Sequence, residues 1–146
     1  MSQSNLEPVK WENYNIGDSA EHVKTVTKED VEKFADITGD YNPIHMNDEY
    51  AKTTMFKTRI AHGVLSVGLI SACLGVKLFG PGILYGSQQS TFKKPVFFGD
   101  TLKVVCTVTD KFTKKEGKLK FLTVETKVYN QKDEVVTDGE AQIIFA

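Results

Sequence analysis

Cysteine is scarce in this chain of 146 residues, with only Cys73 and Cys106 present and no Cys-x-x-Cys spacing. Two cysteines so far apart exclude a zinc knuckle and a disulfide framework of the secreted kind. Residues 1–11 also lack the basic start and apolar run of a signal peptide. The sequence therefore predicts a cytoplasmic protein whose two cysteines are small apolar core residues.

An excess of one charge is missing as well. The 18 Lys and Arg residues against 19 Asp and Glu residues leave a formal net charge of -1, so no summed field attracts a phosphate backbone or anionic lipid. The longest uncharged stretch, residues 60–76, contains three glycines and His62, and a bilayer span needs ~20 mainly apolar residues. We expect neither nucleic acid nor a membrane as a partner.

What remains is the composition of an ordinary globular domain, with 40% hydrophobic and 25% charged residues. Domains commonly contain ~150 residues, and the chain shows no internal repeat or low-complexity tract. We therefore expect residues 1–146 to form a single domain.

Helical spacing dominates the first half of the chain. Residues 27–30 resemble a capping box, and Gly39 is expected to end the following helix in the left-handed conformation. A short helix is expected at 48–52 and a long one at 62–78, where apolar residues lie all the way round and predict a helix surrounded by protein. Its Gly68 implies that another group approaches the backbone closely.

In the second half the period changes to two. Apolar and polar residues alternate in segments separated by turn signals, which is the pattern of half-buried strands. The expected strands are residues 22–26, 85–92, 101–109, 119–129 and 135–145. A long helix before an antiparallel meander predicts an α+β fold in which one curled sheet wraps around one helix.

The densest cluster of special residues follows the first helix, at residues 38–45. Gly39 and Pro43 restrict the backbone and make the loop stiff, so Asp40 and His45 take fixed positions from which both could hold one water. At neutral pH a carboxylate and an imidazole can both accept a proton. The alternative is an ordinary turn and helix cap, which these residue types also form.

A second element lies at the start of the long helix, where Ala61-His62-Gly63 precedes free backbone N–H groups and the positive end of the helix dipole. Such a site can stabilise a developing oxyanion. His62 could add a third catalytic group or, with Asp40 and His45, a metal ligand. A structural histidine is favoured because no metal-binding spacing is present, and we expect neither a metal nor a cofactor.

The segment from Phe34 to Ala51 resembles the signature of the hydratase 2 family, the MaoC-like (R)-specific enoyl-CoA hydratases. The matching residues are Phe34, Ile37, Thr38, Gly39, Asp40, Asn42, Pro43, Ile44, His45 and Ala51, followed by looser matches at 60–66, 81–82 and 92–101. The resemblance implies a single hot-dog fold, an antiparallel sheet wrapped around a central helix, and a homodimer.

For function, the resemblance implies hydration of a trans-2-enoyl-CoA to an (R)-3-hydroxyacyl-CoA, a lyase reaction of fatty acid metabolism. Asp40 and His45 match the catalytic positions, and Gly63, Asn42 and Ser71 are the expected substrate-binding residues. Gly63 would donate its N–H to the thioester oxygen. Ser71 matches a helix serine that supports the catalytic loop, although a serine bonded within its own helix is an equal alternative.

Two other functions are open at this point. A hot-dog acyl-CoA thioesterase would cleave the same kind of thioester without needing Asp40 and His45, and an acyl-CoA-binding sensor would bind without turnover. The polar run Gln88-Gln89-Ser90 leaves the acyl pocket undefined. Lys57, Arg59, Lys93 and Lys94 could bind CoA phosphates, although a solvated charged edge is the favoured interpretation.

Overall fold

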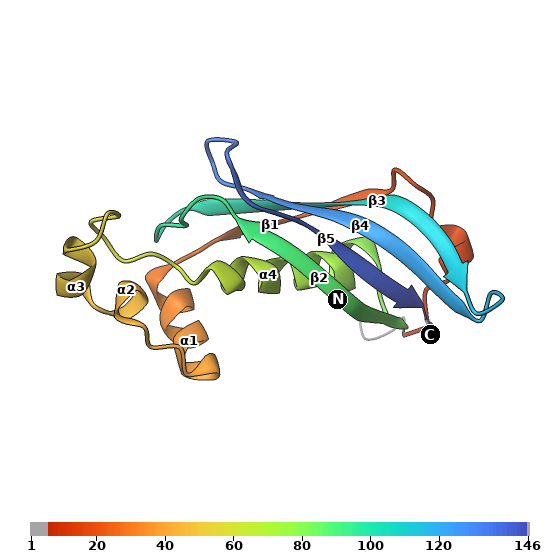
Figure 1. Cartoon of the computed structure of the whole chain (residues 1–146), viewed down its shortest axis with the longest axis horizontal. Helices are drawn as coiled ribbons and strands as arrows, with labels where there is room; N and C mark the ends of the chain where they lie inside the picture. Colours follow the sequence, from red (N-terminus) through yellow and green to blue (C-terminus); the bar gives the residue numbers. More distant parts are fainter. Residues whose placement is uncertain (1–5, 146) are drawn as a thin grey trace.

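The computed structural model describes residues 6–145, which form one five-stranded antiparallel sheet with the helices packed against or beyond one of its faces (Figure 1). The strands are β1 (Ser19–Thr25), β2 (Ile83–Phe92), β3 (Thr101–Lys114), β4 (Leu119–Tyr129) and β5 (Val135–Phe145). The helices are η1 (Trp11–Asn13), α1 (Lys28–Thr38), α2 (Pro43–Met46), α3 (Asp48–Lys52), α4 (Gly63–Ala72) and η2 (Cys73–Leu78). This arrangement confirms the predicted α+β hot-dog fold.

The strand order is β1-β3-β4-β5-β2, so β1 and β2 form the two edges. The strands β4 and β5 have the bounds that the alternation predicts, whereas β3 continues beyond 109 to Lys114. The extension pairs with β4 alone as far as Lys114 opposite Leu119, past the point where β1 ends opposite Thr107. Alternation is weak there because the extension is an edge of the sheet that β1 does not cover, and its residues from Thr109 to Lys114 are exposed or half-buried.

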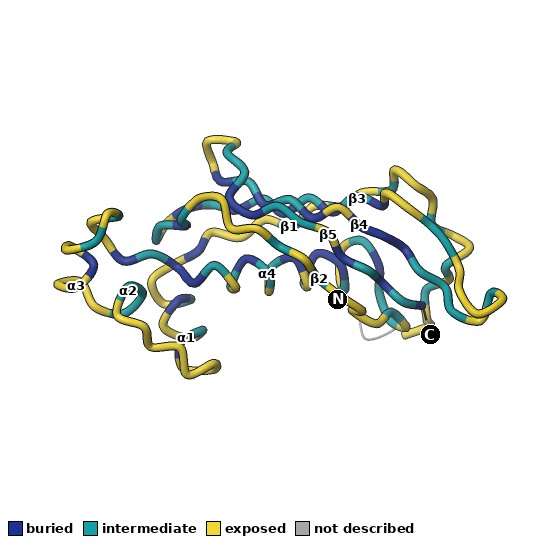
Figure 2. The backbone as a smooth tube through the Cα atoms, in the orientation of Figure 1, coloured by how far each residue is buried: buried dark blue, intermediate teal, exposed yellow. Residues whose placement is uncertain are grey.

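The helices α4 and η2 form one continuous helical segment along the concave face of the sheet, as the long apolar run predicts. The core lies between this helical segment and the sheet, and both contain buried stretches (Figure 2). Its members include Ile70, Cys73 and Leu74 of the helical segment and Leu102 and Ile143 of the strands. Cys73 and Cys106 are both buried free thiols. In residues 6–145 no helix is long and apolar enough to cross a membrane.

The expectation that protein surrounds the long helix is wrong for the chain by itself. One face of α4 is open: the side chain of Val64 is 58% exposed, and Gly68 and Ser71 are exposed too. A Cβ added at Gly68 would have no neighbour within 4 Å among the described residues outside the helix's own backbone. The sheet covers only one side of the helix, so the helix carries more apolar surface than one sheet can bury.

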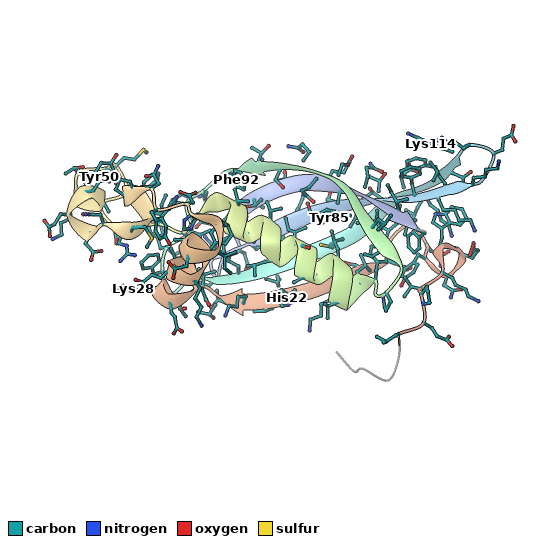
Figure 3. All side chains as sticks on the ribbon, turned by 90° about the horizontal axis from the view of Figure 1, so that it is seen from below. His22, Lys28, Tyr50, Tyr85, Phe92 and Lys114 are labelled. Atoms are coloured by element: carbon teal, nitrogen blue, oxygen red, sulfur yellow. The ribbon has the colours of Figure 1, made fainter. Side chains whose placement is uncertain are left out.

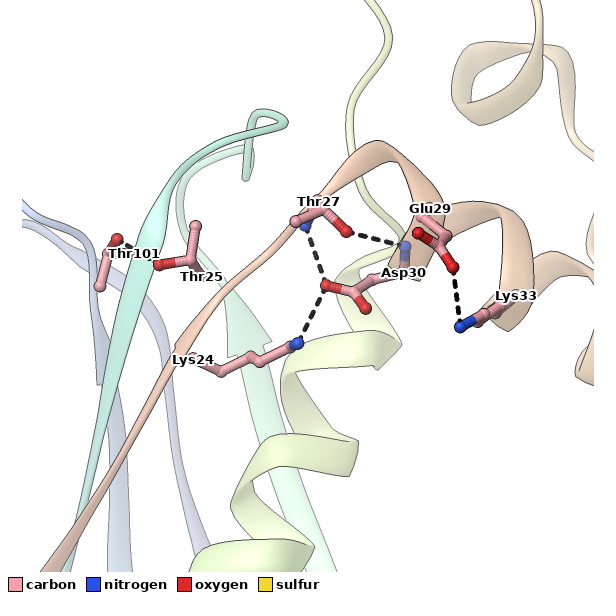
Figure 4. Close-up of polar contacts among 7 residues, drawn as sticks. All are labelled: Lys24, Thr25, Thr27, Glu29, Asp30, Lys33 and Thr101. Carbon is pink, nitrogen blue, oxygen red and sulfur yellow. Dashed lines mark hydrogen bonds and ion pairs between the residues drawn. The ribbon is translucent and has the colours of Figure 1, made fainter.

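The capping box at the start of α1 is confirmed. The Asp30 N–H donates to the Thr27 hydroxyl (3.1 Å), and the Thr27 N–H donates to the Asp30 carboxylate (3.0 Å) (Figure 4). Lys24 adds an ion pair to Asp30 at 3.2 Å. Gly39 ends the helix with φ of 80°, in the left-handed conformation that glycine adopts without strain. Together these contacts determine where the next loop begins.

Candidate active site

The loop after α1 is held by hydrogen bonds of its own, which favour the stiffness that the sequence predicts. The Asn42 side chain accepts from the Ile44 N–H (3.1 Å) and caps α2, a four-residue helix in a segment that the sequence presents as a loop. The Asn42 N–H donates to the Asp40 carboxylate (3.3 Å). Pro43, at the first position of α2, needs no hydrogen-bond acceptor there. The Asp40 side chain is thereby oriented by the loop that carries it.

His45 lies on α2 and is tied to the strand-like segment before α4. Its Nδ1 donates to the Ile60 carbonyl oxygen (2.8 Å), which leaves the lone pair on Nε2. Burial lowers the pKa of His45 below its ordinary value of 6.5, while the bond to Ile60 and the nearby Asp40 carboxylate act in the opposite direction. The net lowering favours the neutral form, which can accept a proton.

Asp40, His45 and His62 come together, each with a nitrogen or carboxylate oxygen within 4.8 Å of the others. Two hydrogen bonds through one bridging water span up to roughly 5.5 Å. The Asp40 and His45 groups are therefore close enough to hold a single water between them. The geometry therefore permits the activation of one water by Asp40 and His45 that the sequence predicts.

A metal ion fits this cluster poorly. The His45 and His62 rings stack with centroids 3.9 Å apart and planes tilted by 31°. A metal must lie in the plane of each imidazole that binds it, and stacked rings direct their in-plane lone pairs side by side rather than toward one point. The expectation of a site without metal stays a prediction that this geometry favours.

The cluster borders a cavity of about 600 Å³. The cavity lies between the segment that carries Asp40 and His45, the start of α4 and the end of β2. Phe92, near the end of β2, lies beside the first turn of α4 (Figure 3). Its lining consists of Asp40, His45, Met55, Phe56, Ile60, Ala61, His62, Gly63, Val64, Phe92, Lys93, Lys94, Pro95, Val96 and Thr137. The size and mixed lining suit a small-molecule ligand with a polar reacting end.

Gly63 occupies the first position of α4 and lines the same cavity as the Asp40 and His45 pair. At this position the backbone N–H has no acceptor within the helix. A Cβ added at Gly63 would lie 3.1 Å from the Phe92 ring, closer than ordinary packing allows. The structure thus places the Gly63 N–H at the cavity that Asp40 and His45 also line, and it adds Phe92 as the side chain that a larger residue at position 63 would have to displace. The role of Gly63 as a donor to substrate stays a prediction.

The other expected substrate-binding residues do not border the cavity. Asn42 faces its own loop as the α2 cap. Ser71 is exposed on the open face of α4, two turns beyond Gly63. The structure therefore brings Asp40, His45 and Gly63 together within one chain, and the roles of Asn42 and Ser71 stay predictions.

Two polar residues near the loop are buried in contacts that sequence reasoning did not predict, Arg59 and Ser66. The Arg59 side chain is 4% exposed and donates through Nε to the His45 carbonyl oxygen (2.7 Å), with its guanidinium 5.1 Å from the Phe98 ring centroid. Ser66 donates to the Gly63 carbonyl oxygen (2.6 Å) and bonds the Thr137 hydroxyl (2.9 Å). No local sequence pattern predicts these contacts, because they depend on burial and on partners that are distant in the sequence.

The basic residues considered for CoA phosphates divide into two groups. Arg59 is buried and committed to the His45 backbone, so it belongs neither to a solvated edge nor to an open phosphate site. Lys93 and Lys94 border the cavity, and each forms an ion pair, with Asp138 at 3.6 Å and with Glu134 at 2.5 Å. Of the four candidates, Lys93 and Lys94 line the cavity, whereas Lys57 is exposed outside its lining.

The polar run on β2 also has a structural explanation. The Gln88 amide nitrogen donates to Ser90 (2.8 Å) and to Thr126 on β4 (3.0 Å), and the Tyr85 hydroxyl donates to the Gln88 carbonyl oxygen. Thr126 is fully buried. Gln88 thus satisfies a polar group on the concave side of the sheet, next to the open face of α4.

The fold and the site together define a hot-dog domain with a carboxylate and imidazole pair at the N-terminus of its central helix. A family model described as the MaoC like domain matches residues 13–132. The chain belongs to this family.

Individual relatives agree with this assignment. The chain is 44% identical to an (R)-specific enoyl-CoA hydratase of Rhodospirillum rubrum, over 99% of this chain and 96% of the relative. It is 40% identical to a 3-hydroxybutyryl-CoA dehydratase of Methylorubrum extorquens, over 94% and 85% of the two chains. Among solved structures it resembles R-hydratase PhaJ1 from Pseudomonas aeruginosa, with a TM-score of 0.85, 40% identity and coverage of 94% and 86%.

Proposed function

We propose that this protein is an (R)-specific enoyl-CoA hydratase, a hydro-lyase that adds water to a trans-2-enoyl-CoA and also catalyses the reverse dehydration. The observation that carries the proposal is the meeting of Asp40, His45 and the Gly63 N–H at one cavity. The relatives named as hydratases and dehydratases support the same reaction class.

In this mechanism a water is held by the Asp40 carboxylate and the neutral His45 Nε2. One of the two takes a proton from the water as the water oxygen bonds to C3, and the pair returns one proton to C2, so that one molecule of water is added across the double bond and the pair regains its starting protonation. The thioester oxygen gains negative charge in the transition state. The Gly63 N–H and the dipole of α4 stabilise that charge.

The reaction needs neither a metal nor a cofactor, since CoA enters as part of the substrate. Lys93 and Lys94 border the cavity, and we assign them to the mouth through which the CoA portion extends. We further propose that residues 1–146 act as one domain and that the protein works in the cytoplasm, which suits its two free thiols. Metal analysis of the purified protein and cell fractionation test these points.

One assay separates this function from its alternatives. Purified protein is mixed with crotonyl-CoA and with longer enoyl-CoAs, the loss of enoyl absorbance is followed, and the product is resolved on a chiral column. The proposal expects the (R)-3-hydroxyacyl-CoA. Release of free CoA thiol without loss of the enoyl group would identify a thioesterase, and binding without turnover would identify a sensor.

We also propose a homodimer, on two features of the single chain. The strand β2 is a sheet edge with unpaired backbone groups, and beside it lies the open face of α4 with Val64, Gly68 and Ser71 exposed. A second copy placed against this face pairs the edges and buries the helix, as symmetric dimers do. A monomeric mass at micromolar concentration with full activity would contradict this part of the proposal.

A further inference from the structure

His62 is the buried polar residue at the centre of the site for which the proposed chemistry supplies no role. Its side chain is 3% exposed, and its ring packs against Phe34 of α1, with centroids 4.7 Å apart, and against His45 of α2 at 3.9 Å. His62 also precedes Gly63 at the start of α4. One imidazole therefore joins three elements that must keep their relative positions if the site is to work.

The hydrogen bonding of His62 determines which nitrogen carries its proton. Nε2 lies 3.0 Å from the Asp40 carbonyl oxygen, which can only accept, so Nε2 is the donor. Nδ1 then carries the lone pair, and it is buried without a partner among residues 6–145. A buried acceptor without a donor costs stability. A phenylalanine would fill the same space between the two rings without the buried lone pair and would lose the single bond to the Asp40 carbonyl oxygen, so ring packing alone does not account for a histidine here.

We propose that His62 is a positioning residue, whose Nε2–H holds the Asp40 backbone and whose ring supports the His45 imidazole at the distance that the shared water requires. The expected effects on kcat rest on the proposed hydratase function, whereas the positions that His62 gives to Asp40 and His45 do not depend on it. His62 acts through Asp40 and His45 and does not itself exchange protons with substrate. Its side chain makes no capping bond to α4, so replacing it leaves the helix start intact.

Two substitutions separate the two contributions of His62. His62→Phe keeps a ring against Phe34 and His45 but removes the donor to Asp40. His62→Gln keeps an amide N–H that can reach the Asp40 carbonyl oxygen but removes the stacked ring. Misplacing reacting groups by about 1 Å can lower a rate by ~100-fold, so we expect kcat to fall ~10- to 100-fold in His62→Phe, with a smaller change in KM. Thermal unfolding should show His62→Phe to be close to wild type in stability, because it loses one hydrogen bond and also removes a buried acceptor that has no donor.

A second measurement needs no substrate. The chain contains three histidines, so their ring signals can be assigned by NMR with His22→Gln as the control, because His22 lies on β1 away from the cavity. The charged and titratable groups around His45 are Asp40, His62 and the buried Arg59, with Lys93 and Lys94 across the cavity. Burial is the largest cause of the lowered pKa of His45, and the His62 ring, whose centroid lies 3.9 Å from that of His45, supplies part of that burial. The pKa of His45 should therefore rise in His62→Gln, where water can enter, and less in His62→Phe, which keeps a ring there.

The outcomes distinguish this inference from the proposed function. If wild type hydrates enoyl-CoA but both folded variants keep kcat within about twofold and the pKa of His45 does not move, His62 is only a packing residue and the inference is wrong. If wild type shows no hydration and the pKa of His45 still rises, the positioning role stands while the function fails. If a variant does not fold, the inference can be tested on wild type alone. The nitrogen chemical shifts of the His62 ring, recorded at about pH 8, above the ordinary imidazole pKa, show which ring nitrogen carries the proton. An Nε2–H tautomer at His62 supports the inference, and an Nδ1–H tautomer overturns it.

Discussion

The proposed catalytic segment, residues 39–62, and the meander of β3, β4 and β5 are held together by different forces. In the meander, buried Val, Leu and Ile residues alternate along each strand and share one core. In the catalytic segment most side chains are exposed, and its position depends on a few hydrogen bonds, among them those of His45, Arg59 and His62. Changes in the first region should therefore alter stability, whereas changes in the second should alter chemistry in a folded protein.

The largest expected effect is on turnover, from the acid/base pair. Asp40→Asn and His45→Gln should each fold and should each lower kcat for hydration by ~10²- to 10⁴-fold, because each removes a proton-accepting group. Stopped-flow or steady-state kinetics with crotonyl-CoA measure the loss. If both groups hold one water, the double variant should be only slightly worse than the worse single variant. Losses that multiply would contradict the shared water.

Next in size is Gly63→Val, which should lower kcat by ~10²- to 10³-fold, as loss of one oxyanion donor does. The added side chain would press on the Phe92 ring and displace the thioester oxygen from the helix N-terminus. The pair Gly63→Val with Phe92→Ala tests the cause, since removing the ring should restore part of the rate. A folded Gly63→Val protein with normal turnover would place the oxyanion site elsewhere.

In the meander we expect substitutions to lower stability and to leave kcat nearly unchanged. Leu102 and Ile143 are fully buried, and Leu102→Ala or Ile143→Ala should lower the free energy of unfolding by about 2–5 kcal/mol. Urea unfolding measures this loss. Below the unfolding transition, kcat should stay near that of wild type, because neither side chain borders the cavity. A large loss of kcat in the folded variant would show that the two regions are coupled.

A smaller effect concerns pH. Because burial lowers the pKa of His45 below 6.5, its neutral form persists as the pH falls through 6.5 and is lost only below the lowered value. The acid limb of kcat/KM should therefore have its midpoint below 6.5. The same shift means that protonation of His45 opposes folding at low pH, since the unfolded chain binds that proton more readily. A midpoint above 6.5 would contradict the burial argument.

The smallest effect is expected at the start of α1. Thr27→Ala removes the capping hydroxyl and should lower the free energy of unfolding by about 1 kcal/mol. Thr25→Ala is the matched control, because its hydroxyl bonds only the exposed Thr101 hydroxyl and surface changes of this kind stay within about 0.5 kcal/mol. Thermal unfolding compares the two. Equal losses would mean that the capping box adds nothing beyond an ordinary surface hydroxyl.

The sequence by itself determined the elements whose cause is local. Alternation placed β4 and β5, the capping box and Gly39 bounded α1, and the cluster around Asp40 and His45 predicted the loop that carries the proposed catalytic pair, because periodicity, capping and turn chemistry act over a few residues. Tertiary structure decided what depends on residues far apart. It buried Arg59 beneath His45, stacked His62 on His45 and left one face of α4 open. Such contacts follow from how a sheet edge, a loop and a helix meet in space, which no local pattern of residues specifies.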